Sequence, residues 1–175
     1  MSKFRFASIL GAAIFVLMGC VGGSSPEENM YNVLEETVSK EGQYVEVQKP
    51  LQELEEKEKE IYTKIMDLGM KEFDQIVKLS DEALDNIKKR KEFIDQERTS
   101  MSEAEEEFAK ADEYVDKLES QDLKKEAEKL KKTMEERYQL HEKLTSSYLD
   151  VLSLDKELYN MFKKKELTME ELEKQ

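Results

Sequence analysis

The chain has 175 residues, of which 28 are Lys or Arg and 41 are Asp or Glu, giving a net charge of -13. Such an acidic surface argues against binding to nucleic acid, because that interaction relies on Lys and Arg that neutralise phosphates. The single cysteine excludes an intramolecular disulfide and a cysteine-based metal site. Charged residues make up 39% of the chain and Trp is absent, a composition typical of long helices or coiled coils. Disorder is the alternative at this charge density.

The first twenty residues have the layout of a bacterial lipoprotein signal peptide. Lys3 and Arg5 precede an uncharged apolar segment, residues 6–17, which is followed by Gly19 and Cys20. The segment is too short to span a bilayer, because a spanning helix needs ~20 apolar residues. We therefore predict cleavage between Gly19 and Cys20 and a lipid on Cys20. A secretory signal peptide that is cut elsewhere is the alternative.

Removal of residues 1–19 would leave 26 basic and 41 acidic residues and would change the net charge from -13 to -15. Because anionic headgroups repel such a surface, the lipid on Cys20 is the expected attachment to the extracellular face of the cell membrane. Residues 20–26 are then a flexible tether that contains Gly and Ser.

Helical periodicity begins after this tether. Ser25 is a suitable N-cap, and Pro26 suits the first position of a helix. Gly42 is expected to weaken or end this first segment. Pro50 predicts a kink or a restart, because the residue before a proline disfavours the helical conformation.

Three apolar seams with alternating steps of three and four residues follow, over residues 44–68, 83–118 and 123–162. The first turn between them lies near Gly69 or near Ser80, and the sequence leaves both open. The short breaks predict an all-α fold, an elongated antiparallel three-helix bundle or coiled coil over residues 27–166. Residues 167–175 contain a capping box and are predicted to form a short C-terminal helix or tail.

Several polar residues occupy positions in the apolar seams, among them Arg90, Glu97, Arg137, His141 and Asp155. A hairpin that turns at about residue 120 brings together residues whose numbers sum to about 241. We therefore predict a contact between Arg90 and Asp155, and a contact of Glu97 with His141 or Arg137. Isolated polar pairs in a coiled coil fix its register, which is the main interpretation. A buried polar site for a ligand is the alternative.

No residue pattern in the chain indicates a metal site, a cofactor or catalysis. His141 is the only histidine, so a structural role is favoured over metal ligation. The acidic runs at residues 53–60 and 103–107 lack the central Gly of a calcium loop and are interpreted as solvated helix faces. Nucleophile elbows, phosphate loops and zinc signatures are absent from the sequence. The protein is therefore predicted not to be an enzyme.

Three tyrosines recur at ten and eleven residues in the last seam, Tyr138, Tyr148 and Tyr159. Three helical turns take about 10.8 residues, so the three rings are expected on one side of the helix. Packing in the core with the hydroxyl groups reaching outward is the favoured interpretation. A stripe that stacks on sugar rings is the functional alternative.

Several segments of the chain resemble the YkyA family, the cell-wall-binding lipoproteins of Bacillus-type Gram-positive bacteria. Besides the lipoprotein signal, the resemblance rests on the Leu, Glu and Ile-Tyr positions of residues 51–62, on Leu79-Ser80-Asp81-Glu82-Ala83, on Arg137-Tyr138 and on Asp155-Lys156-Glu157-Leu158-Tyr159. It covers the whole chain after the signal peptide. It implies a surface lipoprotein on the outer leaflet of a single membrane, facing peptidoglycan, and it implies no catalytic residues.

Together, these features predict a membrane-anchored surface lipoprotein without enzymatic activity. It would bind the cell wall, through peptidoglycan or an associated polymer, or a cell-surface protein. A chaperone-like or regulatory helical module that acts on a secreted protein or a wall hydrolase is the second hypothesis, and catalysis is the third.

Overall fold

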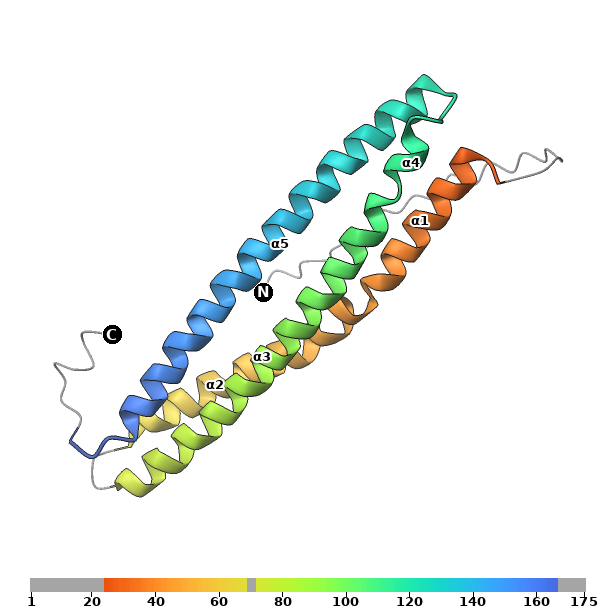
Figure 1. Cartoon of the computed structure of the whole chain (residues 1–175). Helices are drawn as coiled ribbons and strands as arrows, with labels where there is room; N and C mark the ends of the chain where they lie inside the picture. The colour runs from red at the N-terminus through yellow and green to blue at the C-terminus, as the bar shows by residue number, and fades with distance from the viewer. Residues whose placement is uncertain (1–23, 69–71, 167–175) are drawn as a thin grey trace, which may run out of the picture.

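The computed structural model describes residues 24–68 and 72–166, and the secondary structure of these residues is helical. Figure 1 shows three long arms that run side by side in alternating directions, which confirms the predicted elongated antiparallel three-helix bundle. Two helices in series form the first arm, one long helix and a single turn form the second, and one helix forms the third. In chain order these are α1 (Pro26–Lys40), α2 (Gly42–Asp67), α3 (Phe73–Ala109), α4 (Asp112–Val115) and α5 (Gln121–Phe162).

The first arm begins and breaks where the sequence predicts. The Ser25 hydroxyl accepts a hydrogen bond from the backbone N–H of Glu28 at 3.2 Å, and Pro26 opens α1. α1 ends at Lys40 and α2 starts at Gly42, so the break predicted at Gly42 is confirmed. The predicted restart at Pro50 is wrong, because α2 continues through it.

Packing explains why the chain stays helical at Pro50. A proline inside a helix costs about 3 kcal/mol. Its neighbours Val47 and Leu51 are buried in the core at 2% and 7% exposure, and burial of each such side chain contributes about 1.5–3 kcal/mol. Burial of these two side chains thus offsets the cost of Pro50.

The turn between the first two arms lies near Gly69 and not near Ser80. α2 ends at Asp67 and α3 begins at Phe73, whereas Ser80 is a fully buried residue inside α3. Its hydroxyl donates to the backbone carbonyl of Ile76 at 2.8 Å instead of capping a helix. At its other end α3 stops at Ala109, so the seam predicted to run unbroken to residue 118 bends before α4.

α5 begins where the sequence predicts, because the Ser120 hydroxyl caps it through the N–H of Leu123 at 3.4 Å. Its 42 residues make it roughly 63 Å long. α3 is the central helix and packs against α1, α2 and α5. Among the described residues, no helix combines the length and the apolar character that crossing a membrane requires.

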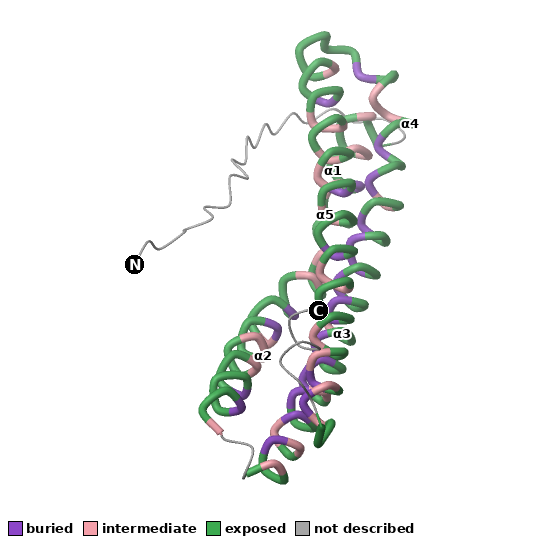
Figure 2. Tube along the Cα trace, turned by 90° about the vertical axis from the view of Figure 1, so that its left-hand side faces the viewer, coloured by how far each residue is buried: buried purple, intermediate pink, exposed green. Residues whose placement is uncertain are grey.

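The buried residues form a line along the bundle (Figure 2) and divide into two apolar clusters. The turn-end cluster lies where α2 meets α3, and it consists of Ile61, Ile65, Ile76, Ala83, Ile87, Leu152, Tyr159 and Phe162. The α4-end cluster consists of Met101, Ala104, Phe108 and Tyr138. The buried residues of the described chain lie between Val33 and Phe162, so a protein that begins at residue 21 contains this whole core.

Candidate functional site

Polar side chains from all three arms meet between the two apolar clusters, around the buried Arg90 and Glu97 of α3. In one layer, Glu97 of α3 is 4% exposed and its Oε1 lies 2.8 Å from Nε2 of His141 on α5. Gln48 of α2 donates to the second oxygen of Glu97 at 2.9 Å. The ring of Tyr44 meets the imidazole edge-on at a centroid distance of 5.7 Å. Each arm therefore contributes a polar group to this layer.

A second polar layer lies two helical turns away, around Arg90 of α3. Its Nε donates to the Tyr148 hydroxyl at 2.8 Å, and that hydroxyl donates to Glu55 of α2 at 2.7 Å. Nη1 of Arg90 lies 3.7 Å from Oδ2 of Asp155, a distance that makes an ion pair but leaves this buried nitrogen without a hydrogen bond. The guanidinium also lies 5.1 Å from the centroid of the Tyr148 ring.

The structure thus brings together Arg90 with Asp155 and Glu97 with His141, while Arg137 pairs elsewhere. Its guanidinium makes a bidentate contact with Glu41 at the break between α1 and α2, with Nη2 and Oε2 2.7 Å apart. Glu58, which interrupts the first seam, accepts a hydrogen bond from the Tyr159 hydroxyl. Both contacts join the first arm to α5.

The sequence analysis missed the residues that the first arm contributes, Glu41, Gln48 and Glu55. They are spaced by seven residues, as are Arg90 and Glu97 on α3 and His141, Tyr148 and Asp155 on α5. In each of the two layers, every arm therefore places a polar residue at the same position of its seven-residue repeat. The seven-residue spacing was the available signal, but these residues flank the apolar seam and look like ordinary exposed positions.

Burial keeps the tyrosines of these layers protonated. It raises the pKa of Tyr148 and Tyr159 far above the usual phenol value, and the hydrogen bonds to Glu55 and Glu58 act in the same direction. Burial also raises the pKa of Asp155, more than the nearby Arg90 lowers it. The hydroxyls therefore serve as donors to carboxylates.

The interpretation of Tyr138, Tyr148 and Tyr159 as a sugar-stacking stripe is wrong. Tyr138 is 4% exposed and Tyr159 is fully buried, while Tyr148 is half-buried under Arg90. A ring must present an open face to stack on a sugar, and these rings are packed against the other arms. The hydroxyls of Tyr148 and Tyr159 also point to carboxylates between the helices and not outward.

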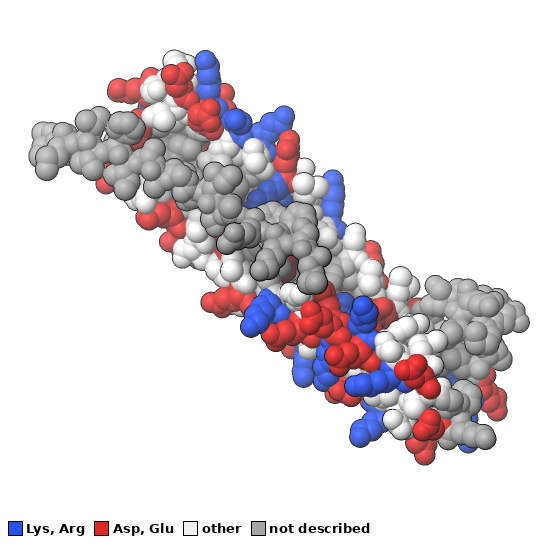
Figure 3. Space-filling model, turned by 180° about the vertical axis from the view of Figure 1, so that it is seen from behind, with Lys and Arg blue, Asp and Glu red and all other residues white. Residues whose placement is uncertain are grey.

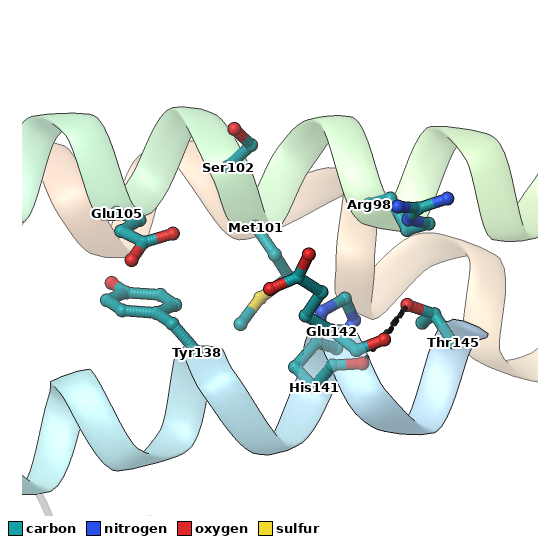
Figure 4. Close-up of a pocket in the computed structure, with 8 residues that line it drawn as sticks. All are labelled: Arg98, Met101, Ser102, Glu105, Tyr138, His141, Glu142 and Thr145. Carbon is teal, nitrogen blue, oxygen red and sulfur yellow. Dashed lines mark hydrogen bonds between the residues drawn. The ribbon is translucent and has the colours of Figure 1, made fainter. Parts of the chain in front are cut away.

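A groove of about 190 Å³ opens between α3 and α5 beside the Glu97–His141 layer (Figure 4). It is lined by Arg98, Met101, Ser102, Glu105, Tyr138, His141, Glu142 and Thr145. Its rim consists of exposed residues, Arg98, Ser102, Glu105 and Glu142. Tyr138, Met101 and Thr145 are buried beneath them.

The Tyr138 hydroxyl is buried beside this groove without a hydrogen-bond partner. Burial, together with the nearby carboxylates of Glu41 and Glu105, raises its pKa to about 12, so the group is an unpaired donor. The rim presents two carboxylates and the guanidinium of Arg98. A group that fits here offers an acceptor oxygen to Tyr138 and donor hydrogens to Glu105 and Glu142.

The surface outside the groove mixes acidic and basic side chains. Figure 3 shows both kinds over the whole described length of one face, without a large basic area. Within the described ranges, no group of three His, Cys, Asp or Glu residues has the arrangement of a metal site. Glu97, Glu55 and Glu58 each accept a hydrogen bond from a side chain of a neighbouring helix.

Comparison with known protein families matches residues 25–175 to a family described as "Putative cell-wall binding lipoprotein". The chain belongs to the YkyA family. This confirms the resemblance that the sequence motifs indicate. A relative, "Uncharacterized lipoprotein YkyA" of Bacillus subtilis (strain 168), is 35% identical over 164 residues, which cover 94% of this chain and 73% of the relative. No solved structure matches the chain.

The family is described as one of lipoproteins, the class of protein that the first twenty residues predict. That signal, with Gly19 and Cys20, lies outside the described residues, as does the predicted C-terminal segment 167–175. The family match begins at residue 25 and therefore coincides with the helical bundle.

Proposed function

We propose that this protein is a non-enzymatic surface lipoprotein that is held on the extracellular face of the cell membrane by a lipid on Cys20 and that contacts the cell wall. Residues 1–19 are the signal peptide and residues 20–26 the tether. Residues 27–166 are the bundle that meets the wall, and residues 167–175 form a short tail.

The observation that carries this proposal is the family match over residues 25–175. The match includes the helical bundle and begins after the predicted signal peptide, which supports the bundle as the part that contacts the wall. The bundle is about 60 Å long, so it extends well beyond a tether of a few residues. Wall polymers that carry phosphate are repelled by a protein with 26 basic and 41 acidic residues after removal of the signal peptide, a net charge of -15. The wall ligand is therefore an amine-bearing group, or an anionic polymer bridged by a divalent cation.

The groove between α3 and α5 is the proposed contact for an amine-bearing group. The carboxylates of Glu105 and Glu142 attract an ammonium group, and a neighbouring hydroxyl or carbonyl oxygen of the ligand accepts the hydrogen bond of Tyr138. Glu105 is exposed, so its side chain can move aside and open the path to the buried hydroxyl. The groove has the size for one sugar ring or one amino acid.

Retention on purified peptidoglycan tests wall binding. A protein of residues 21–175 is expected to sediment with the polymer, and retention that requires calcium would identify a bridged anionic ligand. Tyr138→Phe and Glu142→Gln are each expected to reduce retention several-fold if the groove is the contact. Glu113→Gln on α4 is the matched control, because it removes the same charge away from the groove. Absence of retention with and without calcium would refute wall binding.

The lipid anchor is tested separately by membrane fractionation. Cys20→Ser in the full chain is expected to release the protein from the membrane fraction, because the acidic bundle has no attraction for anionic headgroups. Continued tight association of the variant with membranes would refute the lipid on Cys20. This result is independent of wall binding, so the two parts of the proposal can fail separately.

A chaperone-like or regulatory module is the second candidate function. It is favoured by a row of exposed apolar residues on the first arm, Tyr31, Val38 and Val45, which are spaced by seven residues and 58–65% exposed. Such a row can take the apolar face of a secreted protein. Crosslinking in intact cells distinguishes the candidates, because a protein partner captured through this row and no retention on peptidoglycan would favour the second.

A further inference from the structure

α5 carries a second apolar seam that the bundle leaves largely exposed. Leu140 and Leu144 are each 65% exposed, and Val151 and Leu154 are 50% and 53% exposed. With Ser147 and the partly buried Leu158 they form a row with steps of four, three, four, three and four residues. We call residues 140, 144, 147, 151, 154 and 158 the outer stripe.

The outer stripe differs from the faces of α5 that pack within the chain. The residues that α5 buries against the other arms, such as Tyr138, Thr145, Leu152 and Tyr159, recur at seven residues in another phase of the helix. Steps of three and four that continue for nearly three heptads define a coiled-coil seam. A single exposed leucine is ordinary on a protein surface, but a continuous seam of this kind is the mark of a helix-binding face.

The spacing of the outer stripe is the same in both chain directions. An antiparallel pair of α5 helices therefore matches every stripe residue with another stripe residue, in layers whose numbers sum to 298. Leu140 faces Leu158 of a second copy, Leu144 faces Leu154, and Ser147 faces Val151. A two-fold interface requires this kind of self-complementary surface.

The charges beside the stripe favour the antiparallel over the parallel arrangement. In the antiparallel pair Lys143 of each copy lies beside Glu157 of the other, which gives two attractive contacts, and Asp150 meets Asp150 once. A parallel pair instead places Asp150 beside Asp155 of the other copy, twice. Because Lys143 then has no acidic neighbour across the pair, the parallel arrangement loses both attractive contacts.

We propose that the protein forms an antiparallel homodimer through the outer stripe of α5. The stripe spans 19 residues, about 28 Å of helix, and the interface is at the small end of those that hold stable dimers. The expected dissociation constant is therefore micromolar. Tethering to a membrane raises the local concentration and drives the association further. The inference does not rest on wall binding.

The antiparallel arrangement has a consequence for the anchored protein. α1 begins at the end of the bundle where α4 lies (Figure 1), so the two copies place their lipid-bearing ends at opposite ends of the dimer. Both lipids can enter one membrane only when the dimer lies along its surface. The dimer is then a flat pair of rods and not an upright one.

Disulfide crosslinking of the full chain in isolated membranes tests the partner and its direction. Cells that make the Leu144→Cys and Leu154→Cys variants together are expected to give a crosslinked dimer of the two. Each variant alone is expected to give none, because like residues are then ten positions apart, about 15 Å along the axis. The unmodified chain, whose only cysteine is Cys20, is the control. The proposal would be overturned if each variant crosslinked efficiently when made alone. It would also be overturned if the two variants made together gave no crosslinked dimer.

Sedimentation equilibrium of residues 21–175 gives an independent measurement. Leu144→Glu is expected to weaken association at least tenfold, whereas Leu123→Glu, a similarly exposed leucine outside the stripe, leaves it unchanged. Asp150→Asn is expected to tighten association several-fold, because it removes the one like-charged contact. Higher salt acts in the same direction, since it screens two chains that each have 26 basic and 41 acidic residues, a net charge of -15.

Helix content measured by circular dichroism checks that each variant is folded. The protein could instead be monomeric at all concentrations, with the outer stripe protected from solvent by residues 167–175. This result would contradict the proposed dimer and identify residues 167–175 as the segment that covers the stripe. Removal of residues 167–175 separates these outcomes, because a dimer held by the stripe persists without them.

Discussion

The middle of the bundle and its two ends are stabilised by different interactions. The turn-end and α4-end clusters bury Ile, Leu, Phe and Met, and their contacts are non-directional. The middle buries Arg90 and Glu97, whose partners must have a given position on each arm. Apolar seams of period seven tolerate a shift by one heptad, whereas these polar contacts do not. The two end clusters therefore stabilise the fold without fixing its register, and the polar contacts of the middle select one register.

Removal of Arg90 alone is the strongest test of whether the polar contacts of the middle are specific. Arg90→Leu leaves the partly buried Asp155 without its cationic partner and the Tyr148 hydroxyl without its donor, so we expect a loss of about 3–5 kcal/mol in the free energy of unfolding. Urea unfolding followed by circular dichroism measures it. The triple variant Arg90→Leu, Asp155→Leu and Glu55→Leu is expected to recover most of the loss. A single variant as stable as the parent chain would show that the middle is not specific.

A truncation in the turn-end cluster measures how much apolar burial at the ends of the bundle contributes to the free energy of unfolding. Leu152→Ala removes a side chain that is 3% exposed and leaves a cavity, so we expect a loss of about 3 kcal/mol. Leu140→Ala on the same helix is the matched control and is expected to cost less than about 0.5 kcal/mol, because that leucine is exposed. Equal losses for both variants, measured at a concentration where the chain is monomeric, would contradict the assignment of the core.

The predictions from the sequence succeeded for local features of the helices and failed for some contacts between the arms. The ends of α1 and α5 and the directions of the arms could be predicted, because capping residues and apolar periodicity are local signals. The contact of Arg90 with Asp155 followed from the register of one hairpin. The contact of Arg137 with Glu41 could not be predicted, because it depends on how the first arm is aligned with α5, and the periodicity of each arm does not give that alignment. The burial of Tyr138 and Tyr159 in the core agrees with the favoured interpretation of their spacing. The carboxylate that the Tyr159 hydroxyl contacts could not be predicted, because periodicity places rings on one side of a helix without saying what covers that side.

Tyr138 tests the α4-end cluster at high pH. Its folded-state pKa of about 12 lies above the ordinary value of 10, so the folded state holds the proton more tightly. Its contribution is present below pH 10 and is lost as the pH rises through 12, which corresponds to at most about 2.7 kcal/mol. Tyr138→Phe is expected to lack this part of the alkaline loss in unfolding free energy. An unchanged alkaline profile in the variant would contradict the raised pKa.

The same variant separates stability from binding at neutral pH. The Tyr138 hydroxyl is buried without a partner, so its removal is expected to leave stability unchanged or to raise it by about 1 kcal/mol. Retention on peptidoglycan is expected to fall if the groove binds the wall. A residue that only supported the fold would change both measurements in the same direction.

Ser100 of α3 links the polar middle to the break in the first arm. Its hydroxyl donates to the carbonyl of Lys40 at 2.6 Å and accepts the N–H of Tyr44 at 3.1 Å, so it satisfies two backbone groups that the break between α1 and α2 leaves unpaired. Ser100→Ala is expected to cost about 1–2 kcal/mol of unfolding free energy. Hydrogen exchange at the Tyr44 amide is expected to accelerate, while Ser102→Ala, an exposed serine on the same helix, changes neither measurement. If the amide exchanged at its original rate, the break would be held by the packing of the two arms alone, and the polar contacts of the middle would act only through the register that they impose.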